Sequence, residues 1–309
     1  MNTEKKGHPA GLYLVFFTGM WERFSYYAMR GILVLYLTAT WLNGGLGYDE
    51  KFSTTVYGLA TGLCYFTPLF GGWLSDRYLG QRKSILIGGF IMVLAQFLLF
   101  APELFTTVSP NLTPEQLAHN EFIGRVGLFA GLFLLIIGNG FFKPNISSIV
   151  GDLYEPGDRR LDSAFSIFYM GINLGAVIAP LIVGLLADNV FATTFVDANG
   201  VTQITHGYRY GFLAAAVGVL IGQLLFVFLS NKYLGNIGME PKGAAKLAEY
   251  ASTVVGIEIL HEKQDKENKR AFKRWRSSRG QHGGERRRLY HTIAVGLAFR
   301  TRQSADRKR

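Results

Sequence analysis

The residues best suited to chemistry lie inside the first long apolar stretch of the chain. Between residues 12 and 37, a segment otherwise apolar enough to span a bilayer contains Glu22, Arg23 and Arg30. A charged side chain in hydrocarbon costs about 2.5–3.5 kcal/mol on insertion scales, so such groups usually face a partner or a water-filled cavity. This segment is therefore the first candidate for a functional site.

Helical spacing gathers the polar side chains of this segment on one face. At 100° per residue, one arc of about 140° contains five side chains, those of Glu22, Arg23, Tyr26, Tyr27 and Arg30. Because two cations share this face with one anion, an internal ion pair leaves one positive charge that could receive a carboxylate. The alternative is a buried ion pair that only holds neighbouring helices together.

Composition favours a protein with several membrane spans. Of the 309 residues, 49% are hydrophobic and 17% are charged, against roughly 25% charged in typical globular domains. The single cysteine, Cys64, excludes an internal disulfide and a cysteine-based metal site. The sequence shows no nucleophile–base pair, metal-ligand cluster or phosphate-binding loop. We therefore expect neither an enzyme nor a resident cofactor or metal.

Six apolar runs approach the length of about 20 residues that a helix needs to cross the hydrocarbon core. Backbone groups in lipid must be paired within their own segment, so each run is predicted to be a helix. The predicted spans are 12–37, 54–76, 84–101, 126–150, 164–187 and 211–230. They predict an all-α membrane protein whose six transmembrane helices form one bundle at residues 12–233, after a cytosolic N-terminus at residues 1–11.

The Lys and Arg residues between the spans predict the orientation. Short loops rich in Lys and Arg stay on the cytoplasmic side, and the basic connections follow the second and fourth spans. Arg125 and Arg209, beside the opposite ends of two spans, go against this trend. The balance predicts a multi-pass protein of the inner or plasma membrane with both termini in the cytoplasm.

The formal net charge of +10 comes mainly from the C-terminal part of the chain. We predict a cytosolic linker with an amphipathic segment at residues 234–269 and an Arg-rich tail at residues 270–309. Two interpretations of the tail stay open. It is either a basic segment that binds anionic lipid or a partner, or the product of a shifted reading frame. Neither interpretation includes a nucleic-acid partner.

A loop with Asp76, Arg77 and Arg82 joins the second and third spans. It reads G-G-W-L-S-D-R-Y-L-G-Q-R-K from Gly71 onward. Its charges lie at the cytosolic ends of two helices, where charge pairing and helix dipoles can hold a closed state. We therefore predict a gating loop, and the alternative is an ordinary basic cytoplasmic loop.

Single polar side chains in three other spans extend the candidate site. Lys143 lies in the apolar fourth span, Asn173 in the fifth, and Tyr65 in the second on the same face as Tyr57. Each has a structural alternative. Lys143 could reach the interface with its long side chain, Asn173 could bond to a neighbouring helix, and Tyr65 could simply pack.

Together these segments resemble the proton-coupled oligopeptide transporter family of the major facilitator superfamily. The E-R-F-x-Y-Y run from Glu22, the loop from Gly71, the F-K-P-N run ending at Asn145 and the segment 165–175 occur in the family's order and spacing. The match covers roughly three quarters of the chain. The resemblance implies the major facilitator fold, with this chain as the N-terminal half of an architecture of twelve or more helices.

The resemblance implies proton-coupled uptake of di- and tripeptides, with the proton as coupling ion. Seven residues would line the peptide pocket: Arg23, Tyr26, Tyr27, Arg30, Tyr65, Lys143 and Asn173. Of these, Lys143 and Arg30 would bind the C-terminal carboxylate of the peptide. Glu22 would take part in proton coupling.

Two departures from the family pattern bear on activity. The family motif has another Glu three residues before Glu22, where this chain has Gly19. In addition, the family binds substrate between two six-helix bundles, so this chain would need a second half or a second copy. We therefore expect no transport by the chain alone. The alternatives are a carrier of another anion such as nitrate, or a non-transporting membrane protein with a lipid- or partner-binding basic tail.

Overall fold

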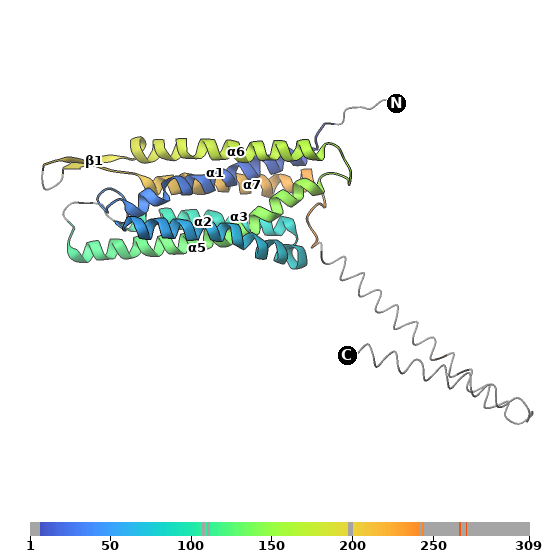
Figure 1. Ribbon diagram of the computed structural model, residues 1–309, viewed down its shortest axis with the longest axis horizontal. Coiled ribbons are helices and arrows are strands. Elements are labelled where there is room, and N and C mark those ends of the chain that lie inside the picture. Colours follow the sequence, from blue (N-terminus) through green and yellow to red (C-terminus); the bar gives the residue numbers. More distant parts are fainter. Residues whose placement is uncertain are drawn as a thin grey trace, which may run out of the picture. The chain divides into compact units, whose positions relative to one another are not determined.

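A computed structural model of the chain (Figure 1) describes residues 7–106, 109, 112–196, 200–241, 243, 266 and 270. The chain divides into two units, Met1–Ala245 and Lys246–Arg309. All helices and strands with assigned bounds belong to the first unit. The predicted linker at residues 234–269 and the predicted tail at residues 270–309 lie almost entirely outside the described residues.

Long helices dominate the first unit. They are α1 (Ala10–Thr38), α2 (Glu50–Leu74), α3 (Gln81–Phe100), α4 (Pro102–Phe105), α5 (Pro114–Asp152), α6 (Leu161–Leu185) and α7 (Tyr208–Leu234). Two π-helical turns, η1 (Ser75–Leu79) and η2 (Leu186–Val190), continue α2 and α6. Strands β1 (Thr193–Val196) and β2 (Thr202–Thr205) form an antiparallel hairpin. The mainly helical fold is confirmed, whereas the hairpin was not predicted.

Four stretches of the described chain are long and apolar enough to cross a membrane. They are Gln81–Phe105, Pro114–Asp152, Leu161–Val190 and Tyr208–Leu234. The helices α1 and α2 have the necessary length, but they do not reach the same apolar threshold. The predicted number of six spans is therefore not confirmed.

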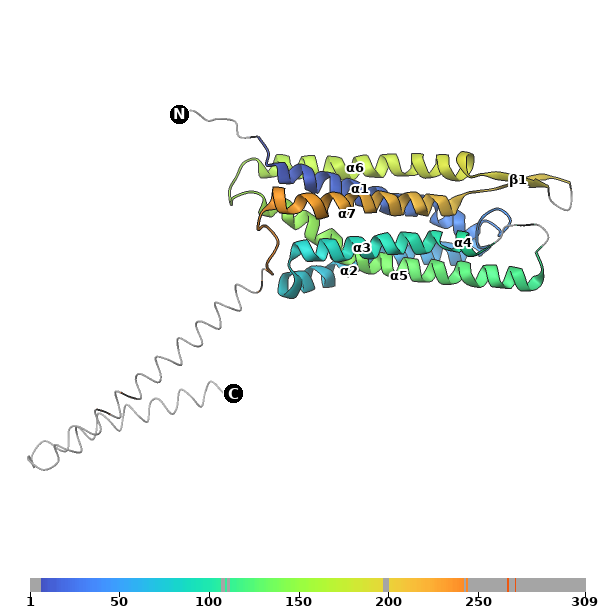
Figure 2. The same ribbon diagram turned by 180° about the vertical axis from the view of Figure 1, so that it is seen from behind.

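The helices lie side by side in a series of packed pairs (Figures 1 and 2). Helix α1 packs on α6 and α7, α3 packs on α7 and α5, and α2 packs on α5. Helices α6 and α2 thus form the two ends of the series, each with one main neighbour. Only four residues of α2 are buried, namely Ser53, Ala60, Cys64 and Gly71. One face of each end helix is therefore uncovered within the described unit.

Glycines let α3 and α5 approach closely. A Cβ atom on Gly138 would lie 2.7 Å from the Gly88 carbonyl oxygen, and one on Gly88 would lie 2.6 Å from the Gly138 oxygen. Membrane helices pack through such small residues because lipid offers no hydrophobic drive for association. This contact fixes the middle of α5, the part that carries Lys143.

Helix α5 begins earlier than the hydropathy pattern predicted, at Pro114 rather than near residue 126. Its start is a capping box. The Thr113 hydroxyl accepts from the Gln116 backbone N–H at 3.2 Å, and the Gln116 side chain accepts from the Thr113 N–H at 3.0 Å. The first turns are polar, so a search for apolar runs does not detect them.

The β1–β2 hairpin is tied to the connection between α1 and α2. The His206 N–H donates to the Asn43 carbonyl at 3.1 Å, the Asn43 amide donates to the Ile204 carbonyl at 2.8 Å, and the Thr205 hydroxyl donates to the Leu42 carbonyl at 2.5 Å. Figure 1 shows the hairpin at the end of the bundle opposite the N-terminus. Two connections are therefore joined at that end.

Candidate functional site

The core of the candidate site is a buried ion pair near the middle of α1. The Nε and NH2 atoms of Arg23 donate to the two carboxylate oxygens of Glu22 at 2.5 and 2.7 Å. Glu22 is 2% exposed and Arg23 is 8% exposed. From α5, the side-chain Nδ2 of Asn139 lies 3.5 Å from Glu22 Oε1, at the outer limit of a hydrogen bond. Both oxygens of this carboxylate thus face protein donors.

Arg30 is held by phenols rather than by a carboxylate. Its Nε and NH2 atoms both donate to the Tyr57 hydroxyl of α2, at 2.8 and 2.6 Å. Its guanidinium also lies over the Tyr26 and Tyr27 rings, 5.8 Å from each centroid. Among the residues that the structure describes, no carboxylate forms an ion pair with Arg30. Its charge is therefore available to an anion.

Lys143 joins the site from α5. Its Nζ atom lies 3.9 Å from the centroid of the Tyr65 ring of α2, within cation–π range. Lys143 is half-buried, whereas Tyr65 is 61% exposed. Within the described part of the chain, Lys143 has no carboxylate within ion-pair distance. Like Arg30, Lys143 is therefore a cation of the site without a described carboxylate partner.

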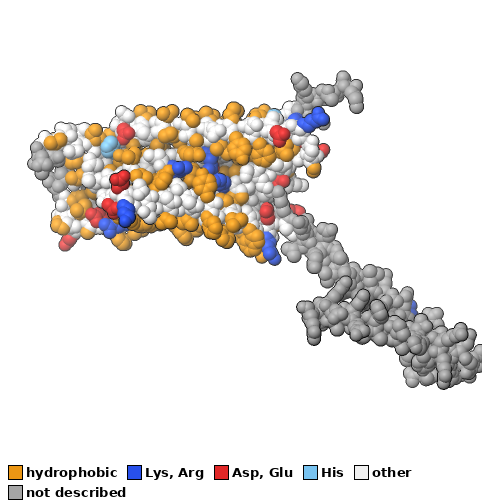
Figure 3. Space-filling view, in the orientation of Figure 1, with side chains coloured by type: hydrophobic (Ala, Val, Ile, Leu, Met, Phe, Trp, Pro, Cys, Tyr) orange, Lys and Arg blue, Asp and Glu red, His pale blue; other side chains and the backbone are white. Residues whose placement is uncertain are grey.

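Three helices thus present cations and phenols on one face. Figure 3 shows Lys and Arg side chains gathered near the middle of a bundle face, among hydrophobic side chains. Guanidinium, ammonium and phenol groups donate hydrogen bonds to carboxylates, and bonds with a charged partner are the stronger ones. The arrangement can bind an anion and offer further donors to neutral carbonyl groups beside it.

The structure brings most of the predicted pocket residues together. Arg23 lies over the Tyr26 ring at 5.1 Å, and the Tyr26 and Tyr27 rings meet edge to face at 5.5 Å. Asn173 differs, because it is exposed on α6 and shares no hydrogen bond with this cluster in the described residues. The role of each residue in binding stays a prediction.

Gly19, the position of the expected additional carboxylate, lies under an aromatic ring. A Cβ atom on Gly19 would lie 2.9 Å from the Cε2 atom of Phe168 on α6. Within this site, α1 therefore meets an apolar ring one turn before Glu22.

Two contributors were not among the predicted pocket residues. Tyr57 was placed on the same face as Tyr65 but was not assigned to the pocket, although it accepts both bonds from Arg30. Asn139 was not considered at all. Its spacing was an available signal, because a residue four positions before Lys143 lies on the same helix face.

The predicted gating residues occupy different environments. Arg82 is 6% exposed, and it donates to the Gly235 carbonyl at 2.6 Å and to the side chains of Ser230 and Asn231 at 2.8 and 2.6 Å. Arg82 thus caps the C-terminal end of α7. Asp76 and Arg77 are exposed on η1, and a gating role for these residues stays a prediction.

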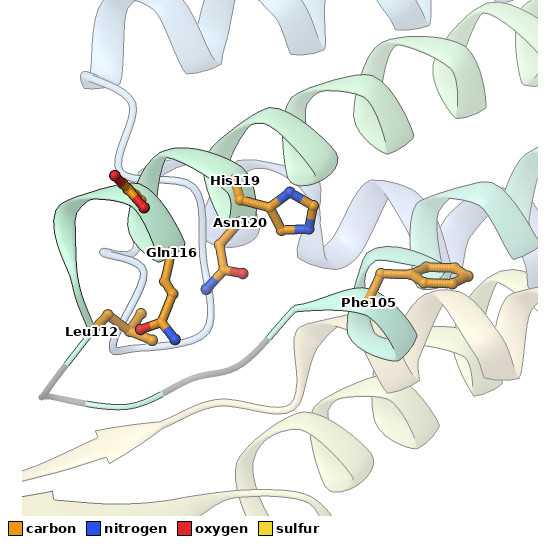
Figure 4. Close-up of a pocket in the computed structure, with 6 residues that line it drawn as sticks. Phe105, Leu112, Gln116, His119 and Asn120 are labelled. Carbon is orange, nitrogen blue, oxygen red and sulfur yellow. The ribbon is translucent and has the colours of Figure 1, made fainter.

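A shallow hollow elsewhere on the chain does not belong to this site (Figure 4). It is lined by Phe105, Leu112, Glu115, Gln116, His119 and Asn120. Lys143 lies roughly 36 Å further along α5 than His119, at 1.5 Å per residue. The described residues also contain no group of three His, Cys, Asp or Glu side chains that could hold a metal ion.

Comparison with protein families and curated proteins gives consistent matches. A model of the POT family matches residues 82–281. The chain is 37% identical to "Uncharacterized transporter YclF" of Bacillus subtilis (strain 168), over 82% of this chain and 44% of that protein. It is also 37% identical to "Di-/tripeptide transporter" of Lactococcus lactis subsp. cremoris, over 84% of this chain and 46% of that protein. The chain thus spans about half the length of these relatives.

Solved structures give the same picture. The crystal structure of peptide transporter POT in complex with sulfate matches with a TM-score of 0.63 and 36% identity, over 83% of this chain and 46% of that one. A POT family transporter in complex with 5-aminolevulinic acid matches with a TM-score of 0.62 and 33% identity, over the same shares.

Proposed function

The chain belongs to the POT family, and from this premise we propose that it supplies the cation-lined bundle of a proton-coupled transporter for di- and tripeptides. The main supporting observation is that Arg30 and Lys143 share one face of the bundle, while no described carboxylate pairs with either. Such cations favour a ligand that brings its own carboxylate. The relative named "Di-/tripeptide transporter" is consistent with a peptide as that ligand.

In this proposal the peptide carboxylate lies between Arg30 and Lys143. The phenols of Tyr26, Tyr27 and Tyr65 border the same space, and they orient the carbonyl groups of the peptide. Arg23 and Asn173 complete the bundle's side of the pocket, with Asn173 approaching from α6 when ligand is bound.

Proton coupling is assigned to Glu22. It is the only acidic residue in α1, and it is ionic while Arg23 donates to both of its oxygens. A ligand or a conformational change that draws Arg23 away leaves the carboxylate in an apolar surrounding, where the protonated form is favoured. Proton binding and ligand binding are then linked, and each affects the other. The proton is the only coupling ion in this scheme.

The proposed architecture is one six-helix bundle in an inner or plasma membrane. Helices α1 and α2 cross the bilayer although they carry polar groups, because those groups face the ligand space. The N-terminal segment, residues 1–11, and the linker that begins at residue 234 lie in the cytoplasm, and the loop with Asp76 and Arg77 acts as a gate. The uncovered faces of α2 and α6 receive a second bundle, from a separate half or a second copy.

Peptide binding tests the proposal directly. We expect the purified chain in nanodiscs to bind a labelled dipeptide, and Lys143→Gln to reduce the affinity at least tenfold. Lys83→Gln is the matched control, because Lys83 is an exposed lysine of α3. Equal loss in both variants, or displacement of the dipeptide by equimolar nitrate, would argue against a peptide pocket.

Uptake tests whether the bundle acts alone. In cells without their own peptide transporters, we expect no accumulation of labelled dipeptide from this chain expressed by itself, because one wall of the pocket is missing. Accumulation that depends on both Lys143 and Glu22 would show that the chain transports without a second bundle, contrary to the proposal.

A further inference from the structure

Asn139 is a buried amide beside the Glu22 carboxylate for which the transport scheme above gives no role. It is 1% exposed, and its Nδ2 atom faces Glu22 Oε1 at 3.5 Å. Its Oδ1 atom is equally buried but has no hydrogen-bond partner in the described structure. Buried polar atoms are nearly always paired, so an unpaired acceptor next to a titratable group needs an explanation.

The backbone around Asn139 is held in place by both neighbouring helices. Gly138 contacts the backbone of α3 at Gly88, and a Cβ atom on Gly140 would lie 2.9 Å from the Cβ of Thr67 on α2. These close contacts oppose a shift of the helix that would move the residue away from Glu22. Rotation of the terminal amide is still possible, since that torsion is soft and roughly two-fold.

We propose that Asn139 is a positioning residue that pairs with both protonation states of Glu22. With the carboxylate, the amide presents its N–H group, as in this structure. When Glu22 takes one proton from water, its new O–H group becomes a donor, and a half-turn of the amide brings Oδ1 into position to accept it. One O–H bond forms on Glu22, Arg23 keeps its proton, and the charge of the cluster rises by one.

The cations, the thiol and the apolar ring around Glu22 cannot take this role. Arg23 on α1 and Lys143 on α5 are cations that only donate, and they favour the carboxylate. Cys64 of α2 offers only a weak donor and acceptor. Helix α6 presents the apolar ring of Phe168 one turn away, at Gly19.

Helices α3 and α7 each contain a buried glutamine, Gln96 and Gln223, whose side-chain oxygen has no partner in the described structure, but neither residue forms a hydrogen bond with Glu22 there. The Gln96 amide of α3 donates to Ser25 at 3.2 Å, and α7 approaches this part of α1 through Gly218 and Gly222. The buried hydroxyls of Thr18 and Tyr26 on α1 also have no partner in the described structure, but Asn139 is the neutral side chain of the described residues that has a hydrogen bond to Glu22. This inference rests on the proposed proton coupling at Glu22, but it can be tested without transport.

Infrared titration of the purified chain in nanodiscs tests the inference. The C=O stretch of a protonated carboxyl group reports Glu22, and Glu22→Gln identifies its band by removing it. We expect Asn139→Leu to move the titration midpoint of that band by roughly half a pH unit or more, about threefold in the proton-binding constant. The band should also shift to higher frequency, because the protonated carboxyl loses its acceptor.

Asn139→Ala gives the same measurement if the leucine variant does not fold, and Asn139→Gln, which keeps the amide, should stay closer to the parent chain. Asn145→Leu is the matched control. Asn145 is also a buried amide of α5, but it bonds to Ser75 and to the Phe141 carbonyl. A Glu22 band that is unchanged in Asn139→Leu and Asn139→Ala, or that moves equally in Asn145→Leu, would overturn the assignment. If the parent chain bound no peptide while Asn139→Leu still moved the Glu22 midpoint as expected, the result would instead count against the proposed function.

Discussion

At the residue scale, one cation of the site is paired with a carboxylate, and two cations have no carboxylate partner among the described residues. Glu22 and Arg23 are neighbours in sequence and bind each other, so they form a unit that is nearly neutral. In the part of the chain that the structure describes, Arg30 and Lys143 are held by phenols and aromatic faces, without a carboxylate. A cation held by an aromatic face keeps its charge available, whereas one held by a carboxylate does not. This difference supports Arg30 and Lys143, rather than Arg23, as the anion-binding pair.

The contact between Lys143 and Tyr65 gives a prediction at this scale. Because the ring face attracts the ammonium group, Tyr65→Leu should lower stability by about 0.5–1 kcal/mol, and Tyr65→Phe should leave it nearly unchanged. The measurement is a double-mutant cycle with Lys143→Met, read from thermal unfolding in detergent. Equal coupling energies for the leucine and phenylalanine variants would mean that the ring does not hold the cation.

The sequence predicted this site unevenly, for a physical reason. The wheel of α1 could gather Glu22, Arg23 and Arg30, because helix geometry fixes the relation between residues of one helix. It could not show that Tyr57 rather than a carboxylate meets Arg30, since that depends on how α2 is placed against α1. Spacing predicted contacts within one helix, whereas only the family resemblance grouped residues of different helices such as Tyr65 and Lys143.

At the element scale, the sequence again predicted what depends on one segment and missed what depends on specific hydrogen bonds. Length and hydropathy predicted the long helices within a few residues at most ends. They missed the first turns of α5, which are polar and start at the capping box of Thr113. They also missed the hairpin, whose strands are four residues each and are anchored by backbone bonds to the connection at Asn43. Both features depend on hydrogen bonds rather than on apolar runs.

Arg82 gives a prediction for the end of α7. Its guanidinium satisfies the Gly235 carbonyl and two side chains, and hydrogen bonds from a charged donor contribute about 1.5–3 kcal/mol each. Arg82→Met should therefore lower the unfolding free energy by at least about 1.5–3 kcal/mol, the contribution of one such bond. Arg77→Met, which changes an exposed arginine of the same loop, should change it by less than about 0.5 kcal/mol. Unfolding in detergent measures the free energy of both variants. Similar decreases would show that the Arg82 hydrogen bonds do not stabilise the end of α7.

The connection between α5 and α6 gives a pH prediction. Arg160 bonds to Asp158 at 2.6 Å and to the Gly7 carbonyl at 2.8 Å. Its hydrogen bonds lower the pKa of Asp158 to about 2. A carboxyl group with a depressed pKa stabilises the fold above its ordinary pKa, near 3.9, and this contribution is lost as the pH falls through the folded value. The N-terminal contact should therefore persist down to about pH 4 and weaken between about pH 4 and 2.

A fluorophore on Gly7→Cys can report this contact. A Cβ atom at Gly7 meets nothing within 4 Å, and the native Cys64 is buried and so protected from labelling. In Asp158→Asn the change between about pH 4 and 2 should vanish. Persistence of that change in the variant would assign it to another group.

At the scale of the whole molecule, the two ends of the bundle differ in charge and in architecture. Basic residues Arg77, Lys83, Arg159 and Arg160 lie in or beside the α2–α3 and α5–α6 connections, and Arg160 bonds to Gly7 near the N-terminus. The hairpin lies at the end of the bundle opposite the N-terminus (Figure 1). From the positive-inside rule we predict that the hairpin lies outside the cell. Two exposed positions test this placement, Thr194 on β1 and Glu155 between α5 and α6.

We expect a membrane-impermeant maleimide to label Thr194→Cys in intact cells and to label Glu155→Cys only after the cells are opened. The parent chain is the control, because its single cysteine, Cys64, is 2% exposed and should stay unlabelled in both conditions. Labelling in the reverse order would place the basic end outside. The predicted positions of both termini would then be wrong.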